Sequence, residues 1–326
     1  MENRLRVTEL DFDQIKTNLK TFLKQQSQFQ DYDFEGAGLS VLVDLLAYNT
    51  HYNAYYLNMV ANESFIDTAL LRDSVVSHAK TLGYTPFSVT APTAVVNITV
   101  DSGTTTPELA TISRGFTLRS NLIDNTSYNF VVMDDITVTK SNTSFYFENV
   151  NIKEGQFATY NFTYSSSSNP KAVFELPNPN VDSSTISVSV RPSVSNTQTV
   201  IYSQATDILD VDSTSNVYFL QEGRNGKYQI YFGDGVIGKA LTDGNYITVN
   251  YLITNGEASN YVDGFVATET VAGYSDVVVD TVSVAAGGSN RETVDNIKYS
   301  ARAQYATQNR LVTIKDYESY IQRNYP

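Results

Sequence analysis

Cysteine and tryptophan are absent from all 326 positions of the sequence, and histidine occurs only twice. Without cysteine the chain has no disulfide, no thiolate nucleophile and no cysteine-ligated zinc site. General acid–base chemistry near neutral pH uses histidine most often, and only His51 and His78 are available for it. Asp44 precedes His51 by seven residues and could share its helix face, but two ligands do not close a metal site. We therefore expect neither a metal nor a cofactor.

Basic residues are also scarce, since 22 Lys and Arg against 35 Asp and Glu give a net charge of −13. Nucleic-acid binding depends on Lys and Arg neutralising phosphates, so we expect no nucleic-acid partner. No stretch approaches the roughly 18 apolar residues that a membrane-spanning helix needs. The N-terminal sequence lacks the apolar segment of a secretory signal. We expect a soluble protein made in the cytoplasm.

Helical periodicity occupies both ends of the chain. Residues 1–88 predict three helices: one after the capping residue Asp11, a second from about Leu39 to Asn62, and a third that Gly83 ends. Residues 286–326 predict a helix after a capping box of Ser289 and Glu292, and a second short helix from Thr313, as a segment that leads into a missing C-terminal half. The expected apolar positions are Phe12, Ile15, Leu19, Phe22 and Leu23 in the first helix, Ile297, Ala301 and Tyr305 after the capping box, and Tyr317, Tyr320 and Ile321 in the last.

Residues 89–285 change to a period of two. Alternating β-branched and polar residues fill segments such as TAVVNITVD, TISVSVR, NYITVNYLIT and DVVVDTVSV, with turn-forming clusters between them. Strands without intervening helices indicate an antiparallel sandwich or barrel. The fold class is therefore α+β, with a helical bundle region, a central antiparallel β-rich domain and a short C-terminal helical segment.

One glycine-rich segment, YFGDGVIGK at 231–239, matches three nucleotide-binding patterns. The dinucleotide fingerprint and the P-loop both require a helix after the glycines, but a strand-like run follows, and Ala240 replaces the P-loop hydroxyl. A kinase loop would need a downstream H-R-D motif, and no histidine follows it. We interpret the segment as a structural turn between hairpin strands, formed by Gly233, Asp234, Gly235 and Gly238.

The predicted second helix carries the candidate interface. Its spacing of three and four residues is that of a short coiled-coil seam, with a polar residue, Asn49, inside it. A second apolar ridge of Leu39, Val43 and Leu46 widens the surface. Periodicity alone leaves open whether the helix joins an intermolecular bundle or packs on strands of its own chain. The seam comprises Leu42, Leu45, Asn49, Tyr52, Tyr56 and Met59.

Three long segments resemble a known family in the expected order. The block YDFEGAGLSVLVDLLAYNTHYNAYYLNMVANESFIDTALLRDSVVSHAKTLGYTP is similar to the N-terminal region of the large baseplate wedge proteins of T-even-type contractile-tailed phages. The blocks GKYQIYFGDGVIGKALTDGNYITVNYLITNGEASN and GGSNRETVDNIKYSARAQYATQNRLVTIKDYE resemble later parts of that family and the wider baseplate-J-like family. The resemblance spans nearly the whole chain, and the family proteins are longer.

The resemblance implies a structural virion protein, assembled in the host cytoplasm and located in the tail baseplate. In this family two copies join a second wedge protein through a helical bundle, and six wedges close around a hub. The ring links tail tube and sheath to the fibres, and its rearrangement releases contraction. By this resemblance the helix from Leu39 to Asn62 is bundle-forming, and the partners are a second copy, other wedge proteins, neighbouring wedges and proteins near the tube and sheath.

Two other classes of function stay open. The Tyr- and Asn-rich β region is compatible with a tail-associated receptor- or carbohydrate-binding protein. A nucleotide-dependent enzyme acting through 233–239 is disfavoured by the context of its motif. The sequence has no G-x-S-x-G nucleophile motif, and nothing in its pattern singles out a catalytic pair among the 35 acidic residues. We therefore predict that the protein is not an enzyme.

Overall fold

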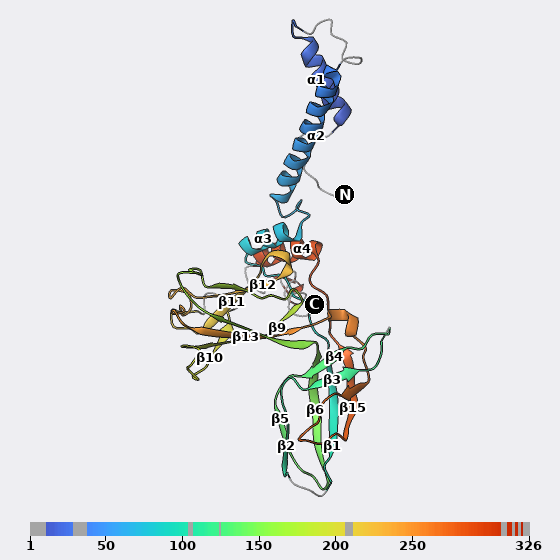
Figure 1. Ribbon diagram of the computed structural model, residues 1–326, viewed down its shortest axis with the longest axis vertical. Coiled ribbons are helices and arrows are strands. Elements are labelled where there is room, and N and C mark those ends of the chain that lie inside the picture. Colours follow the sequence, from blue (N-terminus) through green and yellow to red (C-terminus); the bar gives the residue numbers. More distant parts are fainter. Residues whose placement is uncertain are drawn as a thin grey trace. The chain divides into compact units, whose positions relative to one another are not determined.

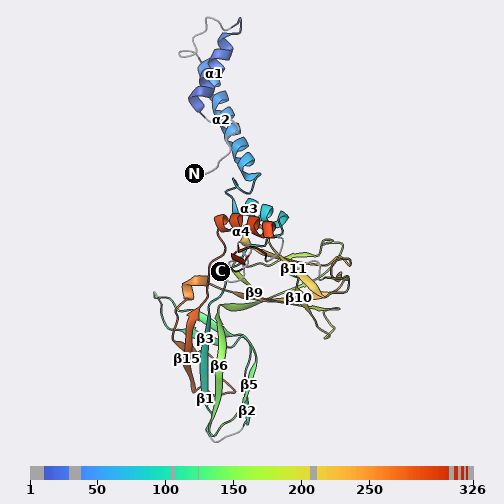
Figure 2. The same cartoon turned by 180° about the vertical axis from the view of Figure 1, so that it is seen from behind.

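The computed structural model describes residues 11–28, 38–103, 107–123, 125–205, 211–307, 312–314, 317–318 and 321. The chain forms two compact units (Figures 1 and 2). One contains Met1–Tyr84 together with Val294–Pro326, and the other contains Thr85–Thr293. The first unit is helical and the second consists mainly of β-sheet, which confirms the α+β class.

The helical unit contains α1 (Phe12–Lys24), α2 (Leu39–Glu63), α3 (Arg72–Thr81) and α4 (Val294–Thr307). The Asp11 side chain accepts hydrogen bonds from the amides of Asp13 and Gln14, so the predicted N-cap of α1 is confirmed. Gly83 ends α3 with φ +76°, a left-handed conformation that favours glycine. At the C-terminal end, Ile314, Tyr317 and Ile321 are helical, whereas Tyr320 lies outside the described residues.

The helices from the two ends of the chain share a core. Ile297 and Ala301 of α4 are fully buried, as expected, whereas Tyr305 is exposed. Arg302 of α4 pairs with Asp67 at 2.5 Å. Figures 1 and 2 show α4 beside α3. The buried cluster consists of Ala69, Val75, Val76, Ala79, Tyr84, Ile297 and Ala301.

A six-stranded sheet forms one half of the β unit, in the order β14-β3-β4-β6-β1-β15, with all pairs antiparallel. Alternate residues of β1 are buried, as the period of two predicts, and Phe130, Phe145 and Phe147 fill the core. A separate pair, β2 with β5, packs its Ala110 and Ile112 into the same core. The strands are β1 (Thr93–Asp101), β2 (Leu109–Ile112), β3 (Thr117–Ser120), β4 (Asn129–Val132), β5 (Ile136–Thr139), β6 (Ser144–Glu154), β14 (Phe265–Ala267) and β15 (Val277–Ala286).

A seven-stranded sheet forms the other half, in the order β7-β13-β9-β10-β11-β12-β8. It curls on itself, because Phe162 of one edge strand stacks on Phe174 of the other at 3.9 Å between ring centroids. The pair β10–β11 is parallel, and the others are antiparallel. The elements are β7 (Gln156–Thr163), β8 (Val173–Glu175), β9 (Val181–Arg191), β10 (Val200–Gln204), β11 (Val217–Glu222), the 3-10 turn η1 (Arg224–Gly226), β12 (Tyr228–Phe232), β13 (Tyr246–Ile253) and the 3-10 turn η2 (Gly256–Ser259).

Two local expectations are wrong. The strands on either side of Gly233–Gly238, β12 and β13, do not form a hairpin, because β9, β10 and β11 lie between them in the sheet. Ser289 and Glu292 do not cap α4, which begins at Val294. Glu292 instead accepts a hydrogen bond from the Phe87 amide at 3.2 Å, and Ser289 forms a β-bridge with Thr90. In both cases the residues pair with strands or amides far away in the sequence, and not with the adjacent segment that the local pattern predicted.

Candidate protein interface

Helix α2 has 25 residues and is therefore about 37 Å long. Its charged residues, Asp44 and Glu63, stand near its two ends, and positions 45–62 contain no Asp, Glu, Lys or Arg. Among the described residues, no helix is both long enough and apolar enough to cross a membrane. An uncharged stretch of this length needs a partner of some kind to cover its apolar side chains.

Helix α1 covers part of α2 and runs antiparallel to it, as Figures 1 and 2 show. The Phe12 ring meets the rings of Tyr48 and His51, each at 6.4 Å between centroids. One turn later, the Lys16 Nζ lies 2.6 Å from a carboxylate oxygen of Asp44. No residue of α1 is fully buried, so this packing is limited.

The buried face of α2 is made of small and amide side chains. Its buried members are Val43, Ala47, Ala54, Asn58 and Asn62. The amide groups of Asn58 and Asn62 donate to backbone carbonyls one turn earlier, at 3.0 and 2.7 Å. At 3.6 residues per turn these positions lie on the side of the helix opposite the predicted seam. The chain therefore buries the small residues of α2 and leaves the large ones outside.

The predicted interface residues lie on the exposed side of α2. Asn49 is also exposed and accepts a hydrogen bond from Asn53 at 3.2 Å. Leu39 is half-buried, and Val43 is buried, so the second predicted ridge is divided between the two faces. The exposed fractions are 53% for Leu42, 62% for Leu45, 54% for Leu46, 41% for Tyr52, 57% for Tyr56 and 40% for Met59.

The exposed surface of α2 is wider than the predicted seam. Two further stripes flank the seam, and their large side chains are between 50% and 67% exposed. The sequence indicates these stripes through the lack of charged residues at 45–62. A helix that is covered on one side only would carry charged residues on its other side. The additional residues are Val41, Tyr48, Tyr55, Leu57 and Val60.

Tyrosine rings form a ladder on this surface. The hydroxyl groups of Tyr48 and Tyr52 lie 2.8 Å apart, and their rings meet at 4.6 Å. Tyr56 continues the contact, with its ring 6.4 Å from that of Tyr52. The hydrogen bond with Tyr48 raises the pKa of Tyr52 above its ordinary value. These rings give α2 apolar contact area with polar ends, which suits contact with both water and apolar groups.

The histidines have structural positions. His78 Nε2 lies 2.8 Å from the Glu63 carbonyl oxygen, and the Glu63 carboxylate accepts hydrogen bonds from the amides of Leu70 and Leu71 at the start of α3. These contacts fix the end of α2 against α3. His51 contacts the rings of Phe12 and Tyr52. Across the described part of the chain, no cluster of three metal-ligating side chains occurs.

The Gly233–Gly238 segment is a tight turn, although not between hairpin strands. The Asp234 carboxylate accepts hydrogen bonds from the amides of Val236 and Ile237 at 2.9 and 3.0 Å. The bond from Ile237, then that from Val236, lowers the pKa of Asp234. A β-carbon on Gly233 would overlap the backbone of Gly238, so the close approach requires glycine. The turn displays Val236, which is 73% exposed.

Comparisons with known proteins identify relatives of both the helical region and the whole chain. Residues 11–84 match the family "Baseplate wedge protein gp6-like, helical domain". The baseplate wedge protein gp6 of Enterobacteria phage T4 is 29% identical over 338 residues, covering 96% of this chain and 50% of that protein. This chain thus spans about half the length of that relative.

A solved structure, the cryo-EM baseplate of the anti-feeding prophage, contains a chain that aligns with 99% of this one and 66% of its own length, at 13% identity and a TM-score of 0.34. The two sequence matches confirm the resemblance predicted from the residues, and they support a structural baseplate wedge protein located in the virion, at the phage tail baseplate.

Proposed function

We propose that this protein is a structural subunit of a baseplate wedge, without enzymatic activity, which associates with a second copy of itself and with other wedge proteins. In this role it joins neighbouring wedges and proteins near the tail tube and sheath into a ring, and it transmits the trigger for contraction. The observation that carries the proposal is the exposed, uncharged surface of α2, because it lies within the segment, 11–84, that matches the helical domain of baseplate wedge proteins.

The helical region and the β region have different roles in this proposal. We propose that the helical region at 1–88 forms the bundle, that the β region at 89–285 forms the body of the subunit, and that 286–326 leads towards a further part of the protein. We also propose that the Gly233–Gly238 turn shapes a contact surface of the β body, because it presents the apolar Val236 at its tip.

Substitution on the seam tests the interface. Leu42→Asp or Tyr52→Asp places a carboxylate where a partner helix would exclude water, and central interface residues typically contribute about 2 kcal/mol or more. We expect each variant to weaken self-association by about 30-fold or more. Size-exclusion chromatography with light scattering, over a concentration series and with co-expressed wedge partners, measures this effect.

Thr50→Asp is the matched control, because Thr50 is exposed on α2 but lies away from the seam. Circular dichroism shows whether the β unit stays folded in every variant. If both seam variants assemble as the parent does, the interface lies elsewhere. If the parent is monomeric at high concentration and ignores every baseplate partner, the proposed function itself is wrong.

A further inference from the structure

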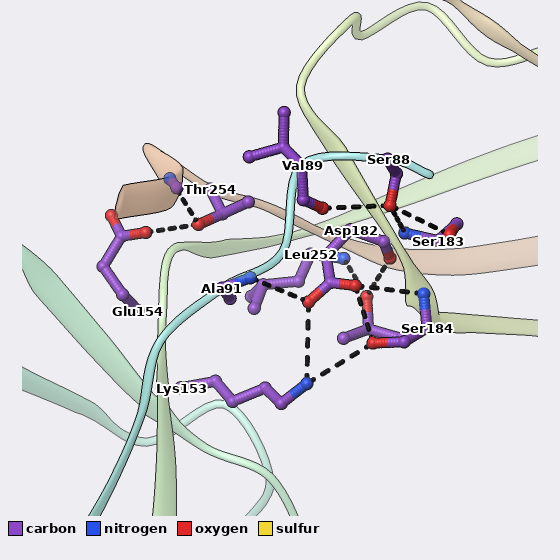
Figure 3. Close-up of polar contacts among 12 residues, drawn as sticks. Ser88, Val89, Ala91, Lys153, Glu154, Asp182, Ser183, Ser184, Leu252 and Thr254 are labelled. Carbon is purple, nitrogen blue, oxygen red and sulfur yellow. Dashed lines mark hydrogen bonds and ion pairs between the residues drawn. The ribbon is translucent and has the colours of Figure 1, made fainter. Parts of the chain in front are cut away.

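The two sheets of the β unit meet at a joint that the chain crosses twice. It passes from β6 to β7 through Gly155, and it returns from β13 to β14 through residues 254–264. A third segment, residues 86–92, runs beside β9 before it enters β1. Ser88 Oγ in this segment donates to Ser183 Oγ and accepts from the Ser183 amide, both at 2.9 Å. Figure 3 shows Ser88 and Ser183 side by side.

A small apolar cluster lies at the centre of the joint. Val131 of the six-stranded sheet and Leu252 of the seven-stranded sheet are buried together with Ala91 of the entering segment. Phe157, the second residue of β7, packs against this group. The Arg114 guanidinium, which belongs to the loop between β2 and β3, lies 4.7 Å above the Phe157 ring. Side chains from both sheets therefore form one small core.

Asp182 forms a set of polar contacts beside this apolar cluster, which we call the Asp182 clamp. Its side chain is fully buried on β9 of the seven-stranded sheet. One carboxylate oxygen accepts from the Ala91 amide at 3.1 Å and lies 3.5 Å from Lys153 Nζ on β6 of the six-stranded sheet. The other accepts from the amide and hydroxyl of Ser184 at 3.0 and 2.6 Å. Figure 3 shows Asp182 directed between Ala91 and Lys153. One carboxylate thus connects three segments of the chain.

Glu154 provides a second clamp in the opposite direction. It is the last residue of β6, and it is 1% exposed. One oxygen accepts from the Thr254 hydroxyl at 2.5 Å and the Asn255 amide at 2.9 Å, and the other accepts from the Asn255 side-chain amide at 2.7 Å. Thr254 and Asn255 directly follow β13. Asp182 therefore reaches from the seven-stranded sheet to the six-stranded sheet, and Glu154 reaches the other way.

Gly155 makes the corner between these clamps possible. Its φ of +131° lies in a region that residues with a β-carbon rarely adopt. A β-carbon at this position would also overlap the carbonyl oxygen of Ile253 at the end of β13. The backbone of β6–β7 thus passes against the backbone of β13 at the point where the sheets join.

We propose that this joint locks the two sheets into one rigid body, so that the β unit transmits a displacement without bending. Units joined by ordinary linkers move relative to one another by default. Here a relative rotation would separate Asp182 from Ala91 and Lys153 and would leave one oxygen of a buried carboxylate without its donors, which is unfavourable. The same rotation would strain the Glu154 clamp, and the second chain crossing would resist it. The proposal concerns the β unit alone and does not depend on the wedge function.

Distance measurement between the two sheets tests the proposal in the full chain. Because the chain has no cysteine, spin labels attach only at introduced positions, and we choose Tyr146→Cys on β6 and Ile201→Cys on β10, which are 51% and 77% exposed. Double electron–electron resonance should give a single narrow distance peak in this labelled parent. Adding Glu154→Gln and Asp182→Asn, which keep the side-chain shapes but place amide donors against donors, should abolish that narrow peak.

Asp243→Asn is the matched control, since Asp243 accepts hydrogen bonds from the amide and hydroxyl of Ser166 within one half of the unit. This control should retain the narrow peak. A broad distribution in the parent would overturn the rigid joint. A narrow peak in the double amide variant with a native circular dichroism spectrum would equally overturn it. Should that variant not fold, Thr254→Val, which removes one donor to Glu154 and the acceptor of the Gly256 amide, is read in the same way.

Discussion

Replacing the buried Asp182 should destabilise the β unit more than replacing any exposed carboxylate. Asp182→Ala leaves the Ala91 amide and the Ser184 amide without their acceptor, at about 1–3 kcal/mol for each buried donor that finds no water. Breaking a buried ion pair by removing one partner costs about 3–5 kcal/mol. The Lys153 side chain is 21% exposed and can turn to solvent, which lowers that cost. We therefore expect a loss of about 3 kcal/mol in the free energy of unfolding.

Asp182→Asn separates the role of the acceptor from the role of packing. The amide fills the same space and one side can still accept from Ser184, but its NH₂ group then faces the Ala91 amide and Lys153. We expect Asn to cost about 1–3 kcal/mol, not zero. If Asn were neutral while Ala were costly, the side chain would contribute volume only, and the argument from hydrogen bonding would be wrong.

Urea unfolding followed by far-UV circular dichroism measures these differences, because the absence of tryptophan removes the usual fluorescence probe. All variants are compared at one protein concentration, since self-association would add to apparent stability. Asp243→Ala is the control, and as an exposed change it should stay within about 0.5 kcal/mol of the parent. If both Asp182 variants also stayed within that range, the buried carboxylate would not hold the joint together.

Three further predictions concern other parts of the chain. Asp234→Ala should remove amide protection of Val236 in hydrogen exchange, and Asp234→Asn, a weaker neutral acceptor, should keep only part of it. Because the folded pKa of Asp234 lies below the ordinary 3.8, the full protection of the parent should be present above pH 3.8 and should fall to the level of the Asn variant as the pH drops through the lower folded pKa; unchanged protection in Asp234→Ala would contradict this. Burial raises the pKa of Tyr218 from 10.0 to about 12, so its stabilisation is complete below pH 10.0 and lost towards pH 12, and Tyr218→Phe should move alkaline unfolding upwards in a circular dichroism titration; an unmoved or lowered midpoint would refute it. Ile297→Ala should cost about 2–4 kcal/mol and raise hydrogen exchange in α3, because Ile297 is fully buried, and unchanged exchange there would argue against a shared core.

Local structure was largely predictable from the residues. The period-two segments became β1, β9, β13 and β15, because alternation directs every second side chain to the core. The cap at Asp11 and the stop at Gly83 were also predictable, since each depends on groups within a few residues. The candidate helix was identified from the spacing of its apolar side chains, and the structure leaves most of these side chains exposed; that they bind a partner stays a prediction.

Pairing over long distances was not predictable in the same way. The capping box that did not form is an example. Glu292 accepts a hydrogen bond from the Phe87 amide, which lies 205 positions away in the sequence, and no local pattern predicts that partner. The hairpin expectation failed for the same reason, because the choice between adjacent and distant strands depends on how the whole sheet curls. Nothing around Asp182 or Glu154 distinguishes them from the other acidic residues, because their burial arises only where two sheets meet.

Residue types and their spacing were enough to establish the α+β class, the position of the main elements, the absence of cysteine chemistry and the apolar character of α2, because each depends on residue type or on spacing within one element. Three features became visible only in the folded chain: which face of α2 is covered, the packing of α4 with α3, and the two buried carboxylates that connect the sheets. These features depend on contacts between residues far apart in the chain, and the free energy of such contacts is set by burial, which only the folded arrangement defines.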